Sequence, residues 1–92
     1  MIIMTQNHIE LIMKEFTRRI KEDIKDGRLP NNVRYIKTEI ACRMQGVYGT
    51  IMAVVPNDNW SDIVWWLDEE LVKLYVELNL PGNPRFGSEE FL

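Results

Sequence analysis

The side chains that could carry covalent chemistry are one histidine and one cysteine. Histidine can act as a general base and cysteine as a nucleophile, but the pair works only when the two lie within hydrogen-bond reach. His8 stands near the start of the chain and Cys42 near its middle, on segments that we expect to form separate elements. We therefore expect Cys42 to be a small buried side chain and His8 a polar residue of a first helical turn.

The sequence also contains few residues that could form a metal site or a phosphate-binding loop. A zinc site needs three or four converging ligands, which two isolated candidates do not provide. The acidic run Asp68-Glu69-Glu70 should splay over a solvated helix face, because successive helical residues point about 100° apart. The segment 46–49 lacks the Lys and the Ser or Thr of a phosphate-binding loop. The sequence thus predicts a protein that is not an enzyme and that uses no metal and no cofactor.

The composition is that of an ordinary globular domain. The chain has 92 residues, of which 46% are hydrophobic and 27% charged, so we expect a single domain over 1–92 with 81–92 as a C-terminal tail. One cysteine cannot form an intrachain disulfide, and no run approaches the roughly 18 apolar residues of a membrane helix. We see no signal-peptide or lipidation pattern and expect a cytoplasmic protein, in its native cell or in an infected host cell.

The first element predicted is a helix over residues 7–26. Asn7 followed by Glu10 is a capping-box-like pair, while Gly27 and Pro30 are typical of a helix end. One apolar stripe recurs at three- and four-residue spacing: Ile9, Ile12, Met13, Phe16, Ile20 and Ile24.

Residues 33–55 are read as a β-hairpin. Apolar and polar residues alternate over 36–44, as in a half-buried strand, and a loop over 46–49 leads to a return strand over 50–55. Pairing across this loop would place six side chains on one face of the sheet: Ile40, Cys42, Met44, Ile51, Ala53 and Val55. A rival interpretation makes this stretch two helices of a helix-turn-helix unit, since Ile36, Ile40, Met44, Val47 and Ile51 also fit helical spacing. β-Branched residues and two glycines favour the strands.

The last element predicted is a helix over residues 59–80. It carries an apolar stripe at spacings of four and three: Trp60, Val64, Leu67, Leu71, Leu74 and Leu78. The expected fold class is therefore α+β, a small helix–β-hairpin–helix (αββα) domain with two amphipathic helices packed on a short antiparallel sheet.

Charge divides the chain into two halves. Residues 1–46 carry nine Lys and Arg against six Asp and Glu, whereas residues 47–92 carry two against eight. The net charge of −3 argues against a protein that coats nucleic acid. The acidic half could engage a basic partner, or the two halves could simply complement each other within one domain.

The last helix is apolar on a second side, opposite its core stripe. A helix that is apolar on two sides is buried on both or exposes a patch for a partner. The residues predicted to bind a partner are Trp65, Trp66, Glu69, Val72, Tyr75 and Val76. We expect the partner to be another protein or a second copy in a homodimer, which would also close the open edges of a two-stranded sheet.

The leading hypothesis is a small acidic protein-interaction module, such as an inhibitor or adaptor, including one encoded by a phage or mobile element. The alternative is a helix-turn-helix-like DNA-binding regulator that uses residues 34–55. Its candidate nucleic-acid contacts are Arg34, Tyr35, Lys37 and Arg43. A third hypothesis, an RNA-binding module on the outward strand face, has only one aromatic residue and two cations to support it. We expect no nucleic-acid partner and no membrane.

Overall fold

The computed structural model describes residues 3–88, which begin with helix α1, Gln6–Lys25. The predicted helix is confirmed to within one residue at each end. The predicted cap is wrong, because Thr5 rather than Asn7 begins the helix. The Thr5 hydroxyl accepts from the His8 backbone N–H at 3.4 Å, and His8 Nδ1 accepts from the Thr5 N–H at 3.1 Å. His8 therefore completes a capping box in the position that Glu or Gln usually takes.

The second helix, α2, runs without interruption over Val33–Val54, and this overturns the predicted β-hairpin. Residues 3–88 contain no strand, so the α+β class is wrong and the described part of the chain is all-helical. Asn32 caps the helix, its side chain accepting from the N–H groups of Arg34 and Tyr35. A single helix over 33–54 also leaves no turn for the helix-turn-helix unit on which the DNA-binding alternative rests.

Burial explains why the helix forms here. The buried side chains recur every three or four residues along α2 and its C-cap: Ile36, Ile40, Met44, Tyr48, Ile51 and Val55. Two residues assigned to the strand pattern, Thr38 and Cys42, are instead exposed. The alternating pattern over 36–44 arises because Thr38 and Cys42 happen to lie midway between the buried residues Ile36, Ile40 and Met44 of the helical stripe. Helix propensities differ by less than about 1 kcal/mol per residue, so burial of the whole stripe overrides them.

The third helix, α3, spans Trp60–Glu77 and follows the short 3-10 turn η1, Asn57–Asn59. It ends three residues before the predicted position. Asn79 adopts a left-handed conformation with φ 56°, and the Leu80 N–H donates to the Tyr75 carbonyl at 2.9 Å. This is a Schellman motif with Asn in the usual glycine position, and it turns the chain back while burying Leu80.

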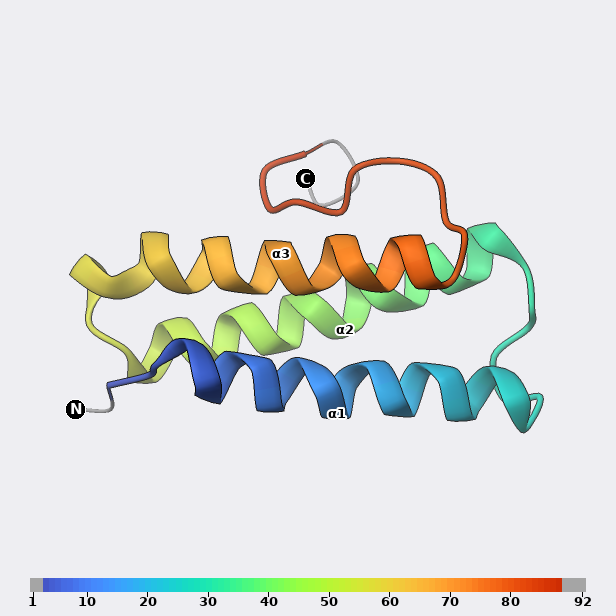
Figure 1. Cartoon of the computed structure of the whole chain (residues 1–92), viewed down its shortest axis with the longest axis horizontal. Helices are drawn as coiled ribbons and strands as arrows, with labels where there is room; N and C mark the ends of the chain where they lie inside the picture. Colours follow the sequence, from blue (N-terminus) through green and yellow to red (C-terminus); the bar gives the residue numbers. More distant parts are fainter. Residues whose placement is uncertain (1–2, 89–92) are drawn as a thin grey trace.

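Figure 1 shows α1, α2 and α3 side by side and running in alternating directions along the long axis of the molecule, with the described residues after α3 folded back along that helix. The molecule measures 39 × 25 × 19 Å. Nine large side chains from all three helices are less than 2% exposed, and they form the centre of the core: Ile9, Met13, Ile20, Ile40, Met44, Ile63, Leu67, Leu71 and Leu74.

Two glycines allow a matched test of the backbone. A Cβ added at Gly49, inside α2, or at Gly27, after α1, meets no atom within 4 Å, but Gly27 has φ 78°. We expect Gly49→Ala to raise the free energy of unfolding by about 0.5–1 kcal/mol, because a glycine inside a helix costs entropy. Gly27→Ala should lower it by about 1 kcal/mol, because L-residues are strained at positive φ. Urea unfolding measures both, and a loss of stability in Gly49→Ala would contradict a continuous α2.

Candidate functional site

Trp65, Val72 and Val76 share one outward face of α3, and we call them the α3 ridge. Their separations of seven and four residues place them along a single stripe. Trp65 is 62% exposed and Val76 is 73% exposed, while Val72 between them is half-buried. The ridge is thus an apolar surface that the helices of the described chain leave open.

The other predicted partner-binding residues are divided by the fold. Glu69 lies on the ridge face, where its carboxylate pairs with Arg85 at 3.4 Å. Trp66 is half-buried and packs against the core, and Tyr75 is 3% exposed. The structure therefore brings Glu69 together with the α3 ridge and turns Trp66 and Tyr75 towards the bundle.

Acidic side chains border the ridge. Asp62 precedes Trp65 by one helical turn and is exposed, as is Asp58 in η1. Neither forms an ion pair within residues 3–88, whereas Glu70 is paired with Lys73 at 3.1 Å. The ridge is therefore an apolar stripe in a negative field, which favours a partner with basic groups around an apolar groove.

The four candidate nucleic-acid contacts are not gathered into one surface. Arg34 and Tyr35 are exposed, but as neighbours on a helix they point about 100° apart. Lys37 lies 5.9 Å from the centre of the Tyr75 ring. Arg43 is held by two carboxylates, Asp23 at 2.6 Å and Glu39 at 2.8 Å, and so joins α1 to α2.

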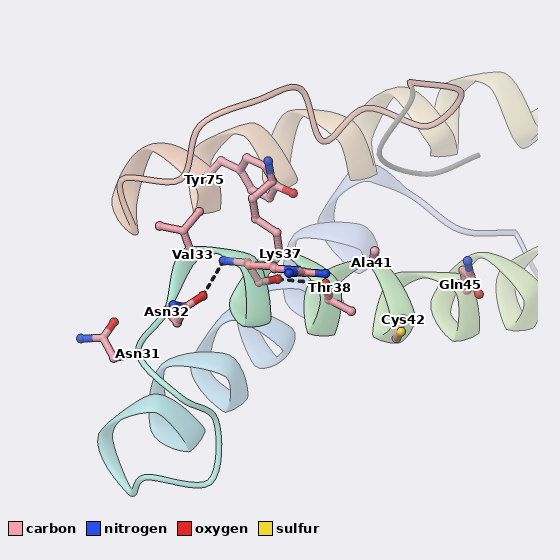
Figure 2. Close-up of a pocket in the computed structure, with 10 residues that line it drawn as sticks. Asn31, Asn32, Val33, Lys37, Thr38, Ala41, Cys42, Gln45 and Tyr75 are labelled. Atoms are coloured by element: carbon pink, nitrogen blue, oxygen red, sulfur yellow. Dashed lines mark hydrogen bonds between the residues drawn. The ribbon is translucent and has the colours of Figure 1, made fainter.

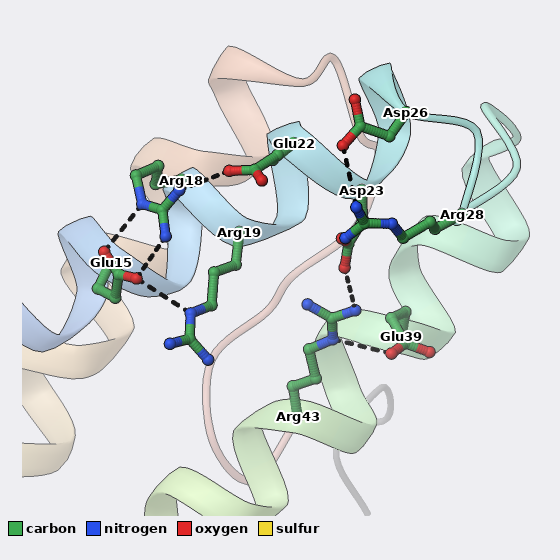
Figure 3. A network of polar contacts seen from close by, with 9 residues as sticks. All are labelled: Glu15, Arg18, Arg19, Glu22, Asp23, Asp26, Arg28, Glu39 and Arg43. Carbon is green, nitrogen blue, oxygen red and sulfur yellow. Dashed lines mark hydrogen bonds and ion pairs between the residues drawn. The ribbon is translucent and has the colours of Figure 1, made fainter.

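Figure 3 shows how far the cations of this region are engaged. Arg18 forms a two-pronged contact with Glu15, with donor–acceptor distances of 2.7 and 2.9 Å, and Arg19 donates to the same carboxylate at 3.0 Å. Hydrogen bonds from these two arginines lower the pKa of Glu15 to about 2. The Arg43 guanidinium likewise lowers the pKa of Asp23. These arginines form ion pairs with carboxylates of α1 instead of a row of free cations that could bind the phosphates of a nucleic acid.

His8 and Cys42 do not form a catalytic pair. His8 is used in the α1 capping box, and Cys42 is exposed on α2 rather than buried as predicted. Residues 3–88 contain no group of three or more His, Cys, Asp or Glu that could hold a metal ion.

Sequence reasoning missed a buried polar joint centred on Asp68. The prediction that the run Asp68-Glu69-Glu70 forms a solvated face is wrong for Asp68, which is 8% exposed. Its Oδ1 accepts from the Tyr48 hydroxyl at 3.1 Å and from the Phe86 backbone N–H at 3.0 Å. Burial raises the pKa of Asp68, against the opposing effect of these two hydrogen bonds, and burial also raises the pKa of Tyr48. The signal that could have found Asp68 is its place beside Leu67, one helical turn from Leu71, next to the core stripe.

The joint fastens residues 80–88, which we call the C-terminal strap, over the α2–α3 side of the bundle. The rings of Tyr48 and Phe86 lie 4.7 Å apart, and Pro84 is buried. Arg85 adds the ion pair with Glu69. The part of the predicted tail that the structure describes is thus packed on the helices, while residues 89–92 lie outside the described residues.

Comparison with known proteins assigns no family to this arrangement. No family model matches the chain, and neither a curated protein nor a solved structure matches it. Within residues 3–88, none of the helices has the length and apolar character needed to cross a membrane.

Variants of Arg43 and Arg19 compare the contribution to stability of a partly buried ion pair between two helices with that of an exposed ion pair within one helix. Arg43 is 32% exposed and bridges two helices, whereas Arg19 is 67% exposed and bonds within α1. Arg43→Ala should lower the free energy of unfolding by about 1 kcal/mol, because it removes the bridge between the helices and leaves Asp23 only its longer contact with Arg28, at 3.4 Å. Arg19→Ala should have no measurable effect. Equal effects in chemical denaturation would contradict the structural role of Arg43.

Asp68 makes stability depend on pH with a defined sign. Because its folded-state pKa is raised above the ordinary 3.8, ionisation disfavours the folded state. The stability of the wild type relative to Asp68→Asn should therefore fall as pH rises from 3.8 through the raised pKa. Denaturant unfolding of both proteins between about pH 3 and pH 7 measures this difference, and a difference that grows with pH would contradict the buried joint.

Proposed function

We propose that the protein is a non-enzymatic protein-interaction module that docks through the α3 ridge onto an apolar groove of a basic partner protein. The observation that carries the proposal is the exposure of Trp65 and Val76, at 62% and 73%, on one face of a helix whose opposite face is fully buried. An inhibitor or an adaptor would act in this way, by occupying or linking surfaces of other proteins.

The geometry of the ridge supports this kind of docking. Anchors at positions i, i+7 and i+11 are the pattern with which an amphipathic helix fills a groove. Tryptophan is among the residues that contribute most when buried in an interface. The core is already filled by side chains from all three helices, so the described bundle does not need the exposed parts of the ridge for its own packing.

The charge around the ridge narrows the choice of partner. Docking two identical ridges on each other would bring together two surfaces that each carry Asp58 and Asp62, which form no ion pair within residues 3–88, and like charges disfavour this contact. The argument from open sheet edges for a homodimer no longer applies, because residues 33–55 form no sheet. We therefore favour a different, basic protein over a second copy, and we retain a cytoplasmic location as part of the proposal.

The test compares a variant that alters two residues of the α3 ridge with a control variant that alters an exposed aromatic residue elsewhere on the surface. A photo-crosslinking amino acid placed at Ser61, which is exposed and lies one helical turn before Trp65, should capture a partner in cells of the native source. Trp65→Ala combined with Val76→Asp should reduce that capture at least tenfold, since loss of one anchor costs about 1–2 kcal/mol or more. Tyr35→Ala, at an aromatic residue 59% exposed on α2, should leave it unchanged.

Two measurements decide the outcome. Circular dichroism must show that the ridge variant keeps its helices. Undiminished capture by the folded ridge variant would overturn the proposal. Light scattering separates the alternative partner: a dimer that the ridge variant abolishes would identify a second copy rather than a basic protein.

A further inference from the structure

An apolar groove runs between the first part of α1 and the second half of α2. It consists of two adjoining depressions of about 700 and 420 Å³, both lined by Ile12, Arg43 and Val47. No residue of α3 lines either of them, so this α1–α2 groove is a surface separate from the α3 ridge. Its main apolar lining comes from both helices and the segment before α1: Met4, Leu11, Ile12, Val47, Ile51 and Val54.

The walls of the α1–α2 groove expose large apolar side chains. Leu11 on α1 is 65% exposed, and Val54 on α2 is 38% exposed. Single exposed apolar residues are ordinary on a protein surface. Here they line one continuous depression together with the half-buried Ile12 and Val47, and a patch of this kind marks a docking surface.

The α2 wall is low enough for another helix to approach it closely. Gly46 and Thr50 lie one helical turn apart and both line the groove. A Cβ added at Gly46 would meet no atom within 4 Å. From Arg43 to Val54 the wall rises about 16 Å, the length of about three turns of a docked helix.

The charged residues of the groove are already paired within the chain. Glu15 accepts from Arg19 at 3.0 Å, and Arg43 bridges two carboxylates of α1 and α2. A charged side chain pressed between the walls would disrupt these pairs or be buried without a partner, and both are costly. The middle of the groove therefore favours an uncharged apolar stripe.

One end of the groove differs, because two arginines stand there on opposite walls. Figure 3 shows Arg19 on α1 and Arg43 on α2. Within residues 3–88, Arg19 donates only through Nε, and Arg43 donates through Nε and Nη2. Both guanidinium groups therefore keep N–H donors, which suit a single carboxylate at this end.

We propose that the α1–α2 groove binds an amphipathic helix of a partner protein, which lies along α1 and α2 as a fourth helix of the bundle. Its uncharged apolar stripe packs on Leu11, Val47 and Val54, and one Asp or Glu at the end of the stripe pairs with Arg19 and Arg43. The inference does not rest on the α3 ridge. A chain that used both surfaces would link two proteins, as an adaptor does.

Other occupants fit the groove less well. A second copy related by a twofold axis would set one groove against the other, and two concave surfaces leave voids between them. Residues 1–2 of the chain span at most about 7 Å, less than half the length of the α2 wall. No described residue of the C-terminal strap lines the groove.

A depression on another side of α2 has no open anchor for a partner. Figure 2 shows this depression, of about 870 Å³, between the first half of α2 and the end of α3. Lys37 and Tyr75 line it, and the Lys37 Nζ lies 5.9 Å from the centre of the Tyr75 ring. Both residues are already engaged in interactions, whereas Leu11 and Val54 in the α1–α2 groove are exposed.

Panning of a displayed peptide library on the full chain tests the proposal. The peptides are helical, have about 16 residues, or four to five turns, and vary along one face. We expect the enriched peptides to carry uncharged apolar residues at three- and four-residue spacing, with Asp or Glu at one end of the stripe. Enrichment of charged stripes, or no enrichment, would contradict the proposal.

Matched variants then locate the most enriched peptide, with its dissociation constant measured by fluorescence anisotropy. Gly46→Gln places a side chain in the groove and Leu11→Gln removes an apolar wall, so each should weaken binding about tenfold. Gly49→Gln is the control for the first, because Gly49 is the other glycine of α2 and does not line the groove. Val76→Gln, on the α3 ridge, is the control for the second. Both controls should change the dissociation constant by less than twofold.

Unfolding is separated from loss of docking by the choice of these positions. Glutamine is a better helix former than glycine, so Gly46→Gln should not lower the free energy of unfolding measured in urea. Leu11 and Val76 are both largely exposed, and circular dichroism checks that their variants keep the helices. Because Val76→Gln alters only the ridge, failure of this proposal and failure of the proposed function give different results.

A double-mutant cycle tests the end of the groove. Exchanging the acidic residue of the peptide for its amide should weaken binding several-fold to the wild type and much less to Arg19→Gln. Equal losses in the two proteins would contradict the carboxylate contact.

Three results would overturn the proposal. The first is equal peptide binding by the wild type and both groove variants. The second is a dimer, detected by light scattering, that Leu11→Gln abolishes, which would assign the groove to a second copy. The third is peptide binding that appears only after residues 1–2 are removed, which would assign the groove to the chain's own beginning.

Discussion

The burial of one stripe of α2 between α1 and α3 is the constraint on which the rest of the structure depends. Six side chains from Ile36 to Val55 are withdrawn from water along the full length of this helix. That length sets the distance over which α1 and α3 must run beside it. It also positions the C-terminal strap, because Tyr48 in the second half of α2 donates to Asp68, which in turn accepts from the strap.

The outer elements could be derived from the sequence because each carries a long core stripe that fits only the spacing of a helix. The apolar residues of α1 fit only the repeat of a helix. Gly27, which follows the helix, has φ 78°, a conformation that glycine adopts without strain. Residues 33–55 fit two periods at once. Ile36, Ile40 and Met44 are spaced by four residues. This spacing is twice the two-residue repeat of a strand and is also close to one turn of a helix, so these residues cannot distinguish the two structures. Tyr48 continues the same spacing, so only Ile51, three residues further on, favours the helix, and Gly46 and Gly49 on either side of Tyr48 resemble the residues of a turn.

The candidate surfaces were partly accessible to the same reasoning. Trp65, Val72 and Val76 follow from helical spacing alone, and the structure places them on one exposed face. The burial of Asp68 and Tyr75 depends on what α2 and the strap bring against them, which spacing within α3 does not contain. The structure also gives a different interpretation of the basic excess in residues 1–46 and the acidic excess in residues 47–92. Several α1 and α2 cations are held by carboxylates of α1 and α2, including Arg18, Arg19 and Arg43. The acidic excess near Asp58 and Asp62 has no such compensation within residues 3–88.

The strap is attached to Asp68 through a main-chain N–H, that of Phe86. Every residue except proline offers this donor, so this hydrogen bond, unlike the ring contact with Tyr48, does not depend on which side chain stands at position 86. The Phe86 ring is 48% exposed, so its outer half is open to change as well. Sequence drift or directed evolution can therefore vary position 86 widely while the strap keeps its register. The acceptor tolerates much less, because a carboxylate or amide oxygen must reach both Tyr48 and the strap from inside the bundle. Related chains should thus be found by an Asp or Asn paired with Tyr across α2 and α3 rather than by the sequence of the strap.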